Sequence, residues 1–204
     1  TLMSAMGVSV LFVGVSGALS QMLRAEGGAL TVQGTMMMIL SLAIGAVAGE
    51  LLDLEDRMER FGAWLKVKTK SESDGGFIGA FVTASLTVCI GAMAIVGSIQ
   101  DGILGDHATL FAKAVLDLVI IMVMTASMGK GCIFSAIPVG ILQGSVTLLA
   151  RLLQPVFTDA ALSNLSLVGS VLVFCVGLNL VWGKRIRVAN LLPSLIVSVV
   201  WAFL

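Results

Sequence analysis

The sequence is poor in charge, in proline and in histidine. Only 12% of its 204 residues are charged, about half the share found in an average soluble domain. The twelve basic and twelve acidic residues balance, so the chain has no basic field of the kind that attracts nucleic acid. The three prolines do not cluster, and no change in composition marks a linker. We therefore predict a single domain over residues 1–204 and no nucleic-acid partner.

The patterns of hydrolytic, phosphate-binding and zinc sites are also missing from the sequence. The one histidine, His107, follows Asp106, and no Ser-His-Asp order or histidine-rich spacing accompanies it. The three cysteines lie far apart in apolar segments, which favours packed side chains over a metal or redox pair. They are Cys89, Cys132 and Cys175. We predict no enzyme activity, no catalytic residue, no metal site and no cofactor, while leaving room for a bound monovalent cation such as Na+ or H+.

Apolar residues, in contrast, make up 58% of the chain, and the mean hydropathy is +1.07. A water-soluble core of this size could not bury so much apolar surface, so the composition predicts an all-α, polytopic transmembrane helix bundle in a lipid bilayer. Seven stretches approach the roughly 20 apolar residues that cross about 30 Å of hydrocarbon. They are residues 2–23, 31–52, 77–97, 108–128, 131–152, 163–182 and 187–204.

The basic residues predict an orientation. If the seven segments alternate in direction, nine basic residues fall on one side of the membrane, and Arg24 and Arg151 fall on the other. The nine are Arg57, Arg60, Lys66, Lys68, Lys70, Lys130, Lys184, Arg185 and Arg187. Because cytoplasmic loops carry the excess of lysine and arginine, we predict that residues 53–74 and 184–187 are cytoplasmic.

An amphipathic helix is predicted between the second and third segments. Apolar residues recur there at three- and four-residue steps, at Leu51, Leu54, Met58, Phe61 and Leu65. The pattern predicts a surface helix over residues 51–66 that continues from the second segment and lies at the membrane interface. A packing role that sets the segment angle is the favoured interpretation, and a lipid or partner site is the alternative.

A weak internal repeat is visible in the glycines. Residues 89–97 (CIGAMAIVG) and 175–183 (CVGLNLVWG) share one spacing, and Gly-x-x-x-Gly occurs at both 45–49 and 140–144. The copies are three segments apart, so they would cross the membrane in opposite directions, as in transporters built from inverted repeats. Chance recurrence of glycine spacing is the alternative.

The stretch 97–117 (GSIQDGILGDHATLFAKAVLD) is the most polar part of the apolar region. Glycines in its first half predict an unwound backbone after Gly97, which would offer carbonyls together with Ser98, Gln100 and Asp101. Such oxygens suit a hard cation or a proton. For Asp106 and the histidine after it, an ordinary loop with Asp106 as a helix N-cap is the favoured interpretation.

Lys113 and Asp117 lie one helical turn apart within the fourth segment, and Asp117 falls near the bilayer midplane. A carboxylate at that depth costs at least about 2.5 kcal/mol, so it needs a reason. The pair predicts an ion-binding site facing a polar cavity, and the alternative is a structural ion pair that fixes helix register.

The fifth segment contains Pro138, which is predicted to break the helix and to expose carbonyl oxygens at mid-depth. The small polar face that follows makes Gln143 and Ser145 further candidate ligands, although close helix packing would use the same residues.

Two further polar residues are candidates for gating or packing. Glu50, near the end of the second segment, could close a gate or start the surface helix. Asn179, in the sixth segment, is expected to bond between helices.

Three motifs carry a resemblance to a known family. The runs CIGAMAIVGSIQDGILGDHATLFAKAVLD, IFSAIPVGILQGSVTLLA and KRIRVANLLPSL resemble those of the YqgA/YdfK-like bacterial membrane proteins, whose domain is one of unknown function (number 554). The resemblance implies a multi-pass protein of the bacterial inner membrane, with a transport role and no assigned substrate. It also implies a further leading apolar segment, so the intact protein is expected to have eight.

Together these features predict a small secondary transporter that couples an ion or proton to a small solute, as a homodimer. An ion channel and a non-transporting membrane scaffold are the alternatives, and saturable flux separates the three. The predicted ligands of the solute or ion are Ser98, Gln100, Asp101, Lys113, Asp117, Gln143 and Ser145, and Glu50, Pro138 and Asn179 are predicted to gate or pack.

Overall fold

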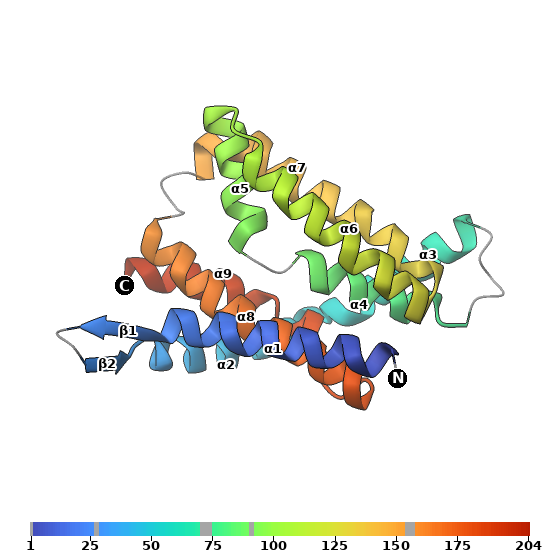
Figure 1. Ribbon diagram of the computed structural model, residues 1–204, viewed down its shortest axis with the longest axis horizontal. Helices are drawn as coiled ribbons and strands as arrows, with labels where there is room; N and C mark the ends of the chain where they lie inside the picture. Colours follow the sequence, from blue (N-terminus) through green and yellow to red (C-terminus); the bar gives the residue numbers. More distant parts are fainter. Residues whose placement is uncertain (1, 27–28, 70–74, 90–91, 154–157) are drawn as a thin grey trace.

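The computed structural model describes residues 2–26, 29–69, 75–89, 92–153 and 158–204, and these are almost entirely helical (Figure 1). The elements in chain order are α1 Leu2–Met22, β1 Leu23–Glu26, β2 Ala29–Val32, α2 Thr35–Leu52, α3 Leu54–Lys68, α4 Phe77–Cys89, α5 Ala92–Leu104, α6 Ala108–Met128, η1 Lys130–Ser135, α7 Ala136–Leu153, α8 Asp159–Trp182, η2 Val188–Leu191, α9 Pro193–Val200 and η3 Trp201–Phe203. The η elements are short 3-10 helices.

The helices form two groups (Figure 1). α1, α2, α8 and α9 pack together along one side of the molecule, whereas α5 packs on α6 and α7 along the other. α4 lies between the groups, where its buried Phe77 and Phe81 join the core formed by Leu172 and Val176 of α8. The two groups therefore share one core, which runs along α4 and α8.

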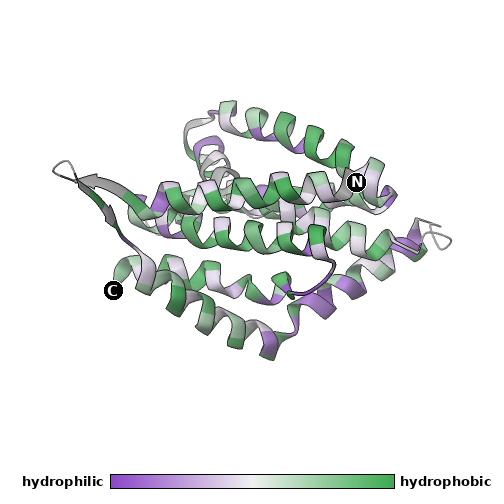
Figure 2. Ribbon diagram, turned by 60° about the horizontal axis from the view of Figure 1, so that its bottom comes forward, coloured by the Kyte–Doolittle hydropathy of each residue, from purple (hydrophilic) through white to green (hydrophobic). Residues whose placement is uncertain are grey.

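The predicted membrane fold is confirmed. Among the described residues, four helical stretches are long and apolar enough to cross a membrane: Thr35–Leu52, Ala108–Met128, Lys130–Ala150 and Asp159–Trp182. Three shorter apolar stretches correspond to the first, third and last predicted segments. The outward faces are also apolar, as a lipid environment requires (Figure 2).

The third predicted segment, residues 77–97, differs from the prediction. It is divided into α4 and α5, and α5 continues through Gly97 as far as Leu104, so the prediction of an unwound backbone after Gly97 is wrong. Gly97 and Gly102 provide close packing instead. A Cβ at Gly97 would lie 3.0 Å from the Leu110 side chain, and one at Gly102 would overlap the carbonyl of Thr147. The turn comes later, at Gly105, where φ is +68°.

Three other boundaries differ from the prediction. The chain breaks at Asp53, where φ is +47°, so α3 does not continue from α2. The last predicted segment, residues 187–204, is divided into η2, α9 and η3. Pro193 at the start of α9 has no N–H to donate to the preceding turn, which accounts for the break between η2 and α9. An antiparallel hairpin, β1–β2, was not predicted, and it fills the connection between α1 and α2.

Glycine allows the closest helix contacts. Gly49 of α2 lies so near η2 that a Cβ would overlap the carbonyl oxygen of Asn190. A Cβ at Gly14 of α1 would lie 2.6 Å from the backbone nitrogen of Phe174 in α8, which is also too close. The glycine-rich faces of these helices therefore pack against other helices of the same chain. The homodimer stays a prediction.

The glycines that suggested an inverted repeat have different surroundings in the two halves. Gly97 lies inside α5, whereas Gly183, its counterpart, ends α8 with φ of +80°. Gly45 and Gly49 pack on backbone, whereas Gly140 and Gly144 have open space where a Cβ would stand. The inverted repeat stays a prediction.

Residues 184–187 lie beside α3, as the distribution of basic residues predicts. Lys184 forms an ion pair with Glu55 at 2.9 Å, and Arg187 Nη1 lies 3.6 Å from Glu50. The end of the molecule that holds α3 and residues 184–187 is called the α3 face below. The turn at Gly105 lies at the opposite end of α6 from η1, which packs on α4.

Candidate functional site

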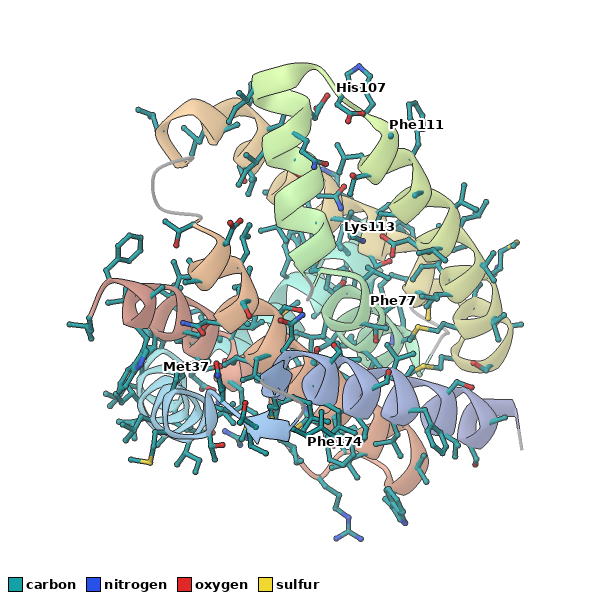
Figure 3. The ribbon with its side chains drawn as sticks, turned by 60° about the vertical axis from the view of Figure 1, so that its left-hand side comes forward. Met37, Phe77, His107, Phe111, Lys113 and Phe174 are labelled. Carbon is teal, nitrogen blue, oxygen red and sulfur yellow. The ribbon has the colours of Figure 1, made fainter. Side chains whose placement is uncertain are left out.

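Lys113 lies on the inward side of α6 (Figure 3), and it forms an ion pair with Asp117 of the same helix. The Lys113 side chain is 8% exposed and that of Asp117 is 21% exposed. Lys113 Nζ also donates a hydrogen bond of 2.9 Å to the carbonyl of Val88, in the last turn of α4. Because the last carbonyls of a helix have no intrahelical donor, the ammonium satisfies both the carboxylate and the end of α4.

The surroundings of the pair are apolar. Further along the same face of α6, Met124 is buried against Ala80 and Ala84 of α4. A cation-carboxylate pair in such surroundings needs both members, because removing one strands the other charge. The ammonium has a second partner in the Val88 carbonyl, whereas the carboxylate is held by the ammonium. Asp117 is therefore the member of the pair whose negative charge a proton or Na+ could neutralise.

A second polar group lies where α5 turns into α6. Asp101 pairs with His107, and Thr109 Oγ1 donates a hydrogen bond of 2.7 Å to Gln100 Oε1. Asp106 Oδ1 accepts a hydrogen bond of 3.0 Å from the amide of Ala108, the first residue of α6, but the N-cap position belongs to His107 and not, as predicted, to Asp106. The structure thus brings Gln100 and Asp101 together with the start of α6.

Ser98 precedes Gln100 by two residues on α5. It is fully buried, and its hydroxyl donates a hydrogen bond of 2.7 Å to the carbonyl of Ala94. That bond belongs to a continuous helix, so Ser98 could offer its oxygen, but not an unwound backbone, to a ligand.

The candidates on α7 are not brought to the α6 pair. Ser145 is exposed, and its hydroxyl donates to the carbonyl of Leu142 in its own helix. Gln143 is half-buried on the same helix, which packs mainly on α5. The prediction that Pro138 breaks a helix at mid-depth is wrong. A 3-10 helix precedes α7, so Pro138 falls in the first turn of α7, where a missing N–H costs little.

The two candidates for gating or packing lie at the α3 face. Glu50 is exposed and pairs with Arg187. Asn179 Oδ1 accepts hydrogen bonds from the amides of Arg185 and Ile186, and its Nδ2 donates to the carbonyl of Ile186. Asn179 therefore holds the turn that follows α8, and the predicted bond between helices is wrong for this residue.

Glu55 is a buried acid that the sequence analysis missed. It is 6% exposed, and its carboxylate accepts from Lys184 and, at 3.0 Å, from the amide of Ala189. Its own amide donates a hydrogen bond of 2.7 Å to Asn190 Oδ1. A signal was present, because Glu55 follows Leu51 by four residues and so falls inside the apolar stripe of the surface helix.

A cavity of about 440 Å³ opens beside this acid at the α3 face. Its walls come from α3, α4, the end of α6, α8 and η2. Three charged side chains line it, Glu55, Glu59 and Lys184, and most of the remaining wall is apolar, including Val82, Leu86, Val176, Leu180 and Val188. Pockets of this size and composition are typical of small-molecule sites.

Lys184 joins the two acids, and this predicts a pH dependence of stability. Partial burial lowers the pKa of Lys184, but hydrogen bonds to Glu59 and Glu55 and the charges of both acids raise it by more, so the pKa lies above its usual 10.5. The stabilisation is therefore complete below pH 10.5 and is lost as the pH rises through the higher folded-state pKa. Because Lys184 is 56% exposed, the gain is about 1 kcal/mol or less.

We expect Lys184→Met to lower the unfolding temperature slightly near neutral pH, and to match the wild type well above pH 10.5. Thermal unfolding in detergent across this range measures both values. Lys130→Met removes another lysine that is not paired with Glu55 or Glu59. The difference between its unfolding temperature and that of the wild type should not shrink as the pH rises above 10.5. A Lys184→Met deficit that persists at high pH would contradict the role given to its charge.

Comparison with known proteins identifies the family. The family described as "Protein of unknown function (DUF554)" matches residues 1–203. "Uncharacterized membrane protein YdfK" of Bacillus subtilis (strain 168) is 29% identical over 202 residues, covering 99% of this chain and 82% of that protein. "Uncharacterized protein YqgA" of Escherichia coli (strain K12) is 28% identical over 165 residues, covering 79% and 70%. No solved structure matches the chain. The sequence resemblance is confirmed, and the chain is a membrane protein of the DUF554 family.

Proposed function

We propose that this protein is a small secondary transporter that couples an ion or a proton to the movement of a small solute. The observation that carries the proposal is the buried Lys113–Asp117 pair at the end of α4. α4 has 13 residues and so spans roughly 20 Å, less than the ~30 Å hydrocarbon core. Its last turn therefore ends within the bilayer, where half-helix ends form the ion and substrate sites of many transporters.

Asp117 is the proposed site of the coupling ion. When H+ or Na+ neutralises its carboxylate, Lys113 keeps its bond to the Val88 carbonyl and is released from the ion pair. The ammonium then keeps a hydrogen-bond acceptor but loses its compensating charge, so ion binding changes the stability of this arrangement, which is what a coupled carrier needs. The translocation path would continue from Asp117 toward the face opposite α3, and its ligands there would be Ser98, Gln100 and Asp101 of α5.

The protein is proposed to lie in the bacterial inner membrane with the α3 face in the cytoplasm. The nine-to-two distribution of basic residues supports that orientation, because positive loops stay on the cytoplasmic side. A homodimer is part of the proposal, since about 200 residues enclose a translocation path poorly alone.

Reconstitution into liposomes tests the proposed function. Solid-supported membrane recordings with pools of amino acids, organic acids, amines and sugars, each under a Na+ or pH gradient, should give transient currents that saturate with solute concentration. A channel would instead give a conductance that does not saturate, and a scaffold would give neither signal. Either of these two results would overturn the proposal.

A further inference from the structure

We propose that the cavity at the α3 face is a binding site for a small organic cation, a protonated amine with an apolar body. Binding there does not depend on the proposed transport, because it requires only the residues that line the cavity. The features that carry it are the charges at the mouth, the hydrogen-bonding groups inside and the apolar walls.

The mouth carries more negative than positive charge. Glu55 and Glu59 share a single ammonium, that of Lys184, so the three groups leave one negative charge in excess. Both oxygens of Glu55 are occupied, by Lys184 and by the amide of Ala189. Glu59 Oε1 accepts a hydrogen bond from Lys184, whereas Glu59 Oε2 accepts none from the described part of the chain. Glu59 Oε2 is therefore the acceptor for the ammonium of a ligand.

Two residues with hydroxyl groups, Thr83 and Ser127, also line the cavity. Ser127 Oγ donates its proton to the carbonyl of Met124, which leaves the oxygen free to accept a hydrogen bond from a ligand. Among the described residues that line the cavity, Lys184 is the only charged donor, and both acids already engage it. A ligand that brings donors and a positive charge fits this lining, whereas an anion would meet two carboxylates.

The apolar walls of the cavity fit the carbon body of the proposed amine. The lining of the cavity is mostly apolar and includes Leu86 and Val176. Gly79 of α4 adds open space, because a Cβ there would meet no atom within 4 Å. A ring or short chain of carbon atoms on the amine would fill this volume and replace water on the apolar walls.

Binding of cyclohexylammonium to the whole protein in lipid nanodiscs tests the proposal. Cyclohexanol and cyclohexanecarboxylate keep the ring and change only the charge, so they serve as matched probes. Calorimetric titration should give saturable binding of the ammonium, with the alcohol and the carboxylate at least about tenfold weaker. A tenfold difference in affinity corresponds to about 1.4 kcal/mol, roughly the contribution of one charge-assisted hydrogen bond. Equal binding of the three probes, or no saturable binding of the ammonium, would overturn the proposal.

Two variants place the binding in the cavity. Gly79→Leu fills the open space and should abolish binding, whereas Gly140→Leu fills equally open space on α7, outside the cavity, and should leave it unchanged. Glu59→Gln should weaken binding about tenfold, whereas Asp56→Asn, on the same helix but outside the lining, should not. Unchanged binding in Gly79→Leu would contradict the site even if transport were lost, and intact binding without flux would contradict the transporter alone.

Discussion

Replacing Asp117 with asparagine is expected to reduce ion-coupled flux to the level of protein-free liposomes. Asparagine keeps the size and the acceptor oxygen of the side chain but cannot take up a proton or neutralise Na+. Lys113 would keep an acceptor in the Val88 carbonyl but lose its charged partner, so we expect the protein to insert and fold with lower stability than the wild type. The recordings described for the wild type measure the flux, and size-exclusion chromatography in detergent monitors the folded state.

Asp106→Asn is the matched control for this change. Asp106 lies eleven residues earlier, just before the same helix, and asparagine keeps an oxygen that can accept from the Ala108 amide. Flux through this variant should equal that of the wild type. Normal coupled flux in Asp117→Asn, or equal loss in both variants, would remove the special role of Asp117.

Gly49→Ala is expected to give the largest loss of stability among single methyl additions. The new Cβ would overlap the carbonyl oxygen of Asn190, which is backbone and cannot rotate away. η2 also binds Glu55 of α3. The Glu55 amide donates to Asn190 Oδ1, and the Ala189 amide donates to the Glu55 carboxylate, so a shift of η2 would disturb that buried acid. Overpacking of this kind costs about 1–3 kcal/mol or more, and thermal unfolding in detergent should show the loss.

Gly140→Ala gives the opposite expectation. Nothing lies within 4 Å of a Cβ at this position, and alanine favours a helix over glycine by about 0.5–1 kcal/mol. The variant should unfold at the same or a higher temperature. A Gly49→Ala protein as stable as Gly140→Ala would mean that α2 and η2 are not packed as closely as described.

The sequence was sufficient to predict the fold class and the approximate spans. Length and hydropathy alone determine where a chain can cross a bilayer, so α6 begins and ends at the predicted residues. Boundaries that depend on tertiary contact were not predictable. Gly97 and Gly102 looked like helix breakers, but they lie within a helix because Leu110 and Thr147 approach them closely.

The same distinction separates the parts of the candidate site. The Lys113–Asp117 pair follows from a spacing of four on one helix, so periodicity predicted it. The bond from Lys113 to Val88 joins residues 25 apart, and the contacts of Glu55 with Ala189 and Asn190 span more than 130 positions. Only the fold brings such groups together. The position of Glu55 inside an apolar stripe was the one local signal of its burial.

The double variant Lys113→Met, Asp117→Leu tests the central claim most directly. Replacing both members of a buried pair with apolar groups of similar size is often neutral for stability, whereas removing one member is not. A functional pair therefore predicts a folded protein of near wild-type stability that gives no coupled current in proteoliposomes. A double variant that carries solute at the wild-type rate would show that the pair is structural and that the ion-coupling site lies elsewhere.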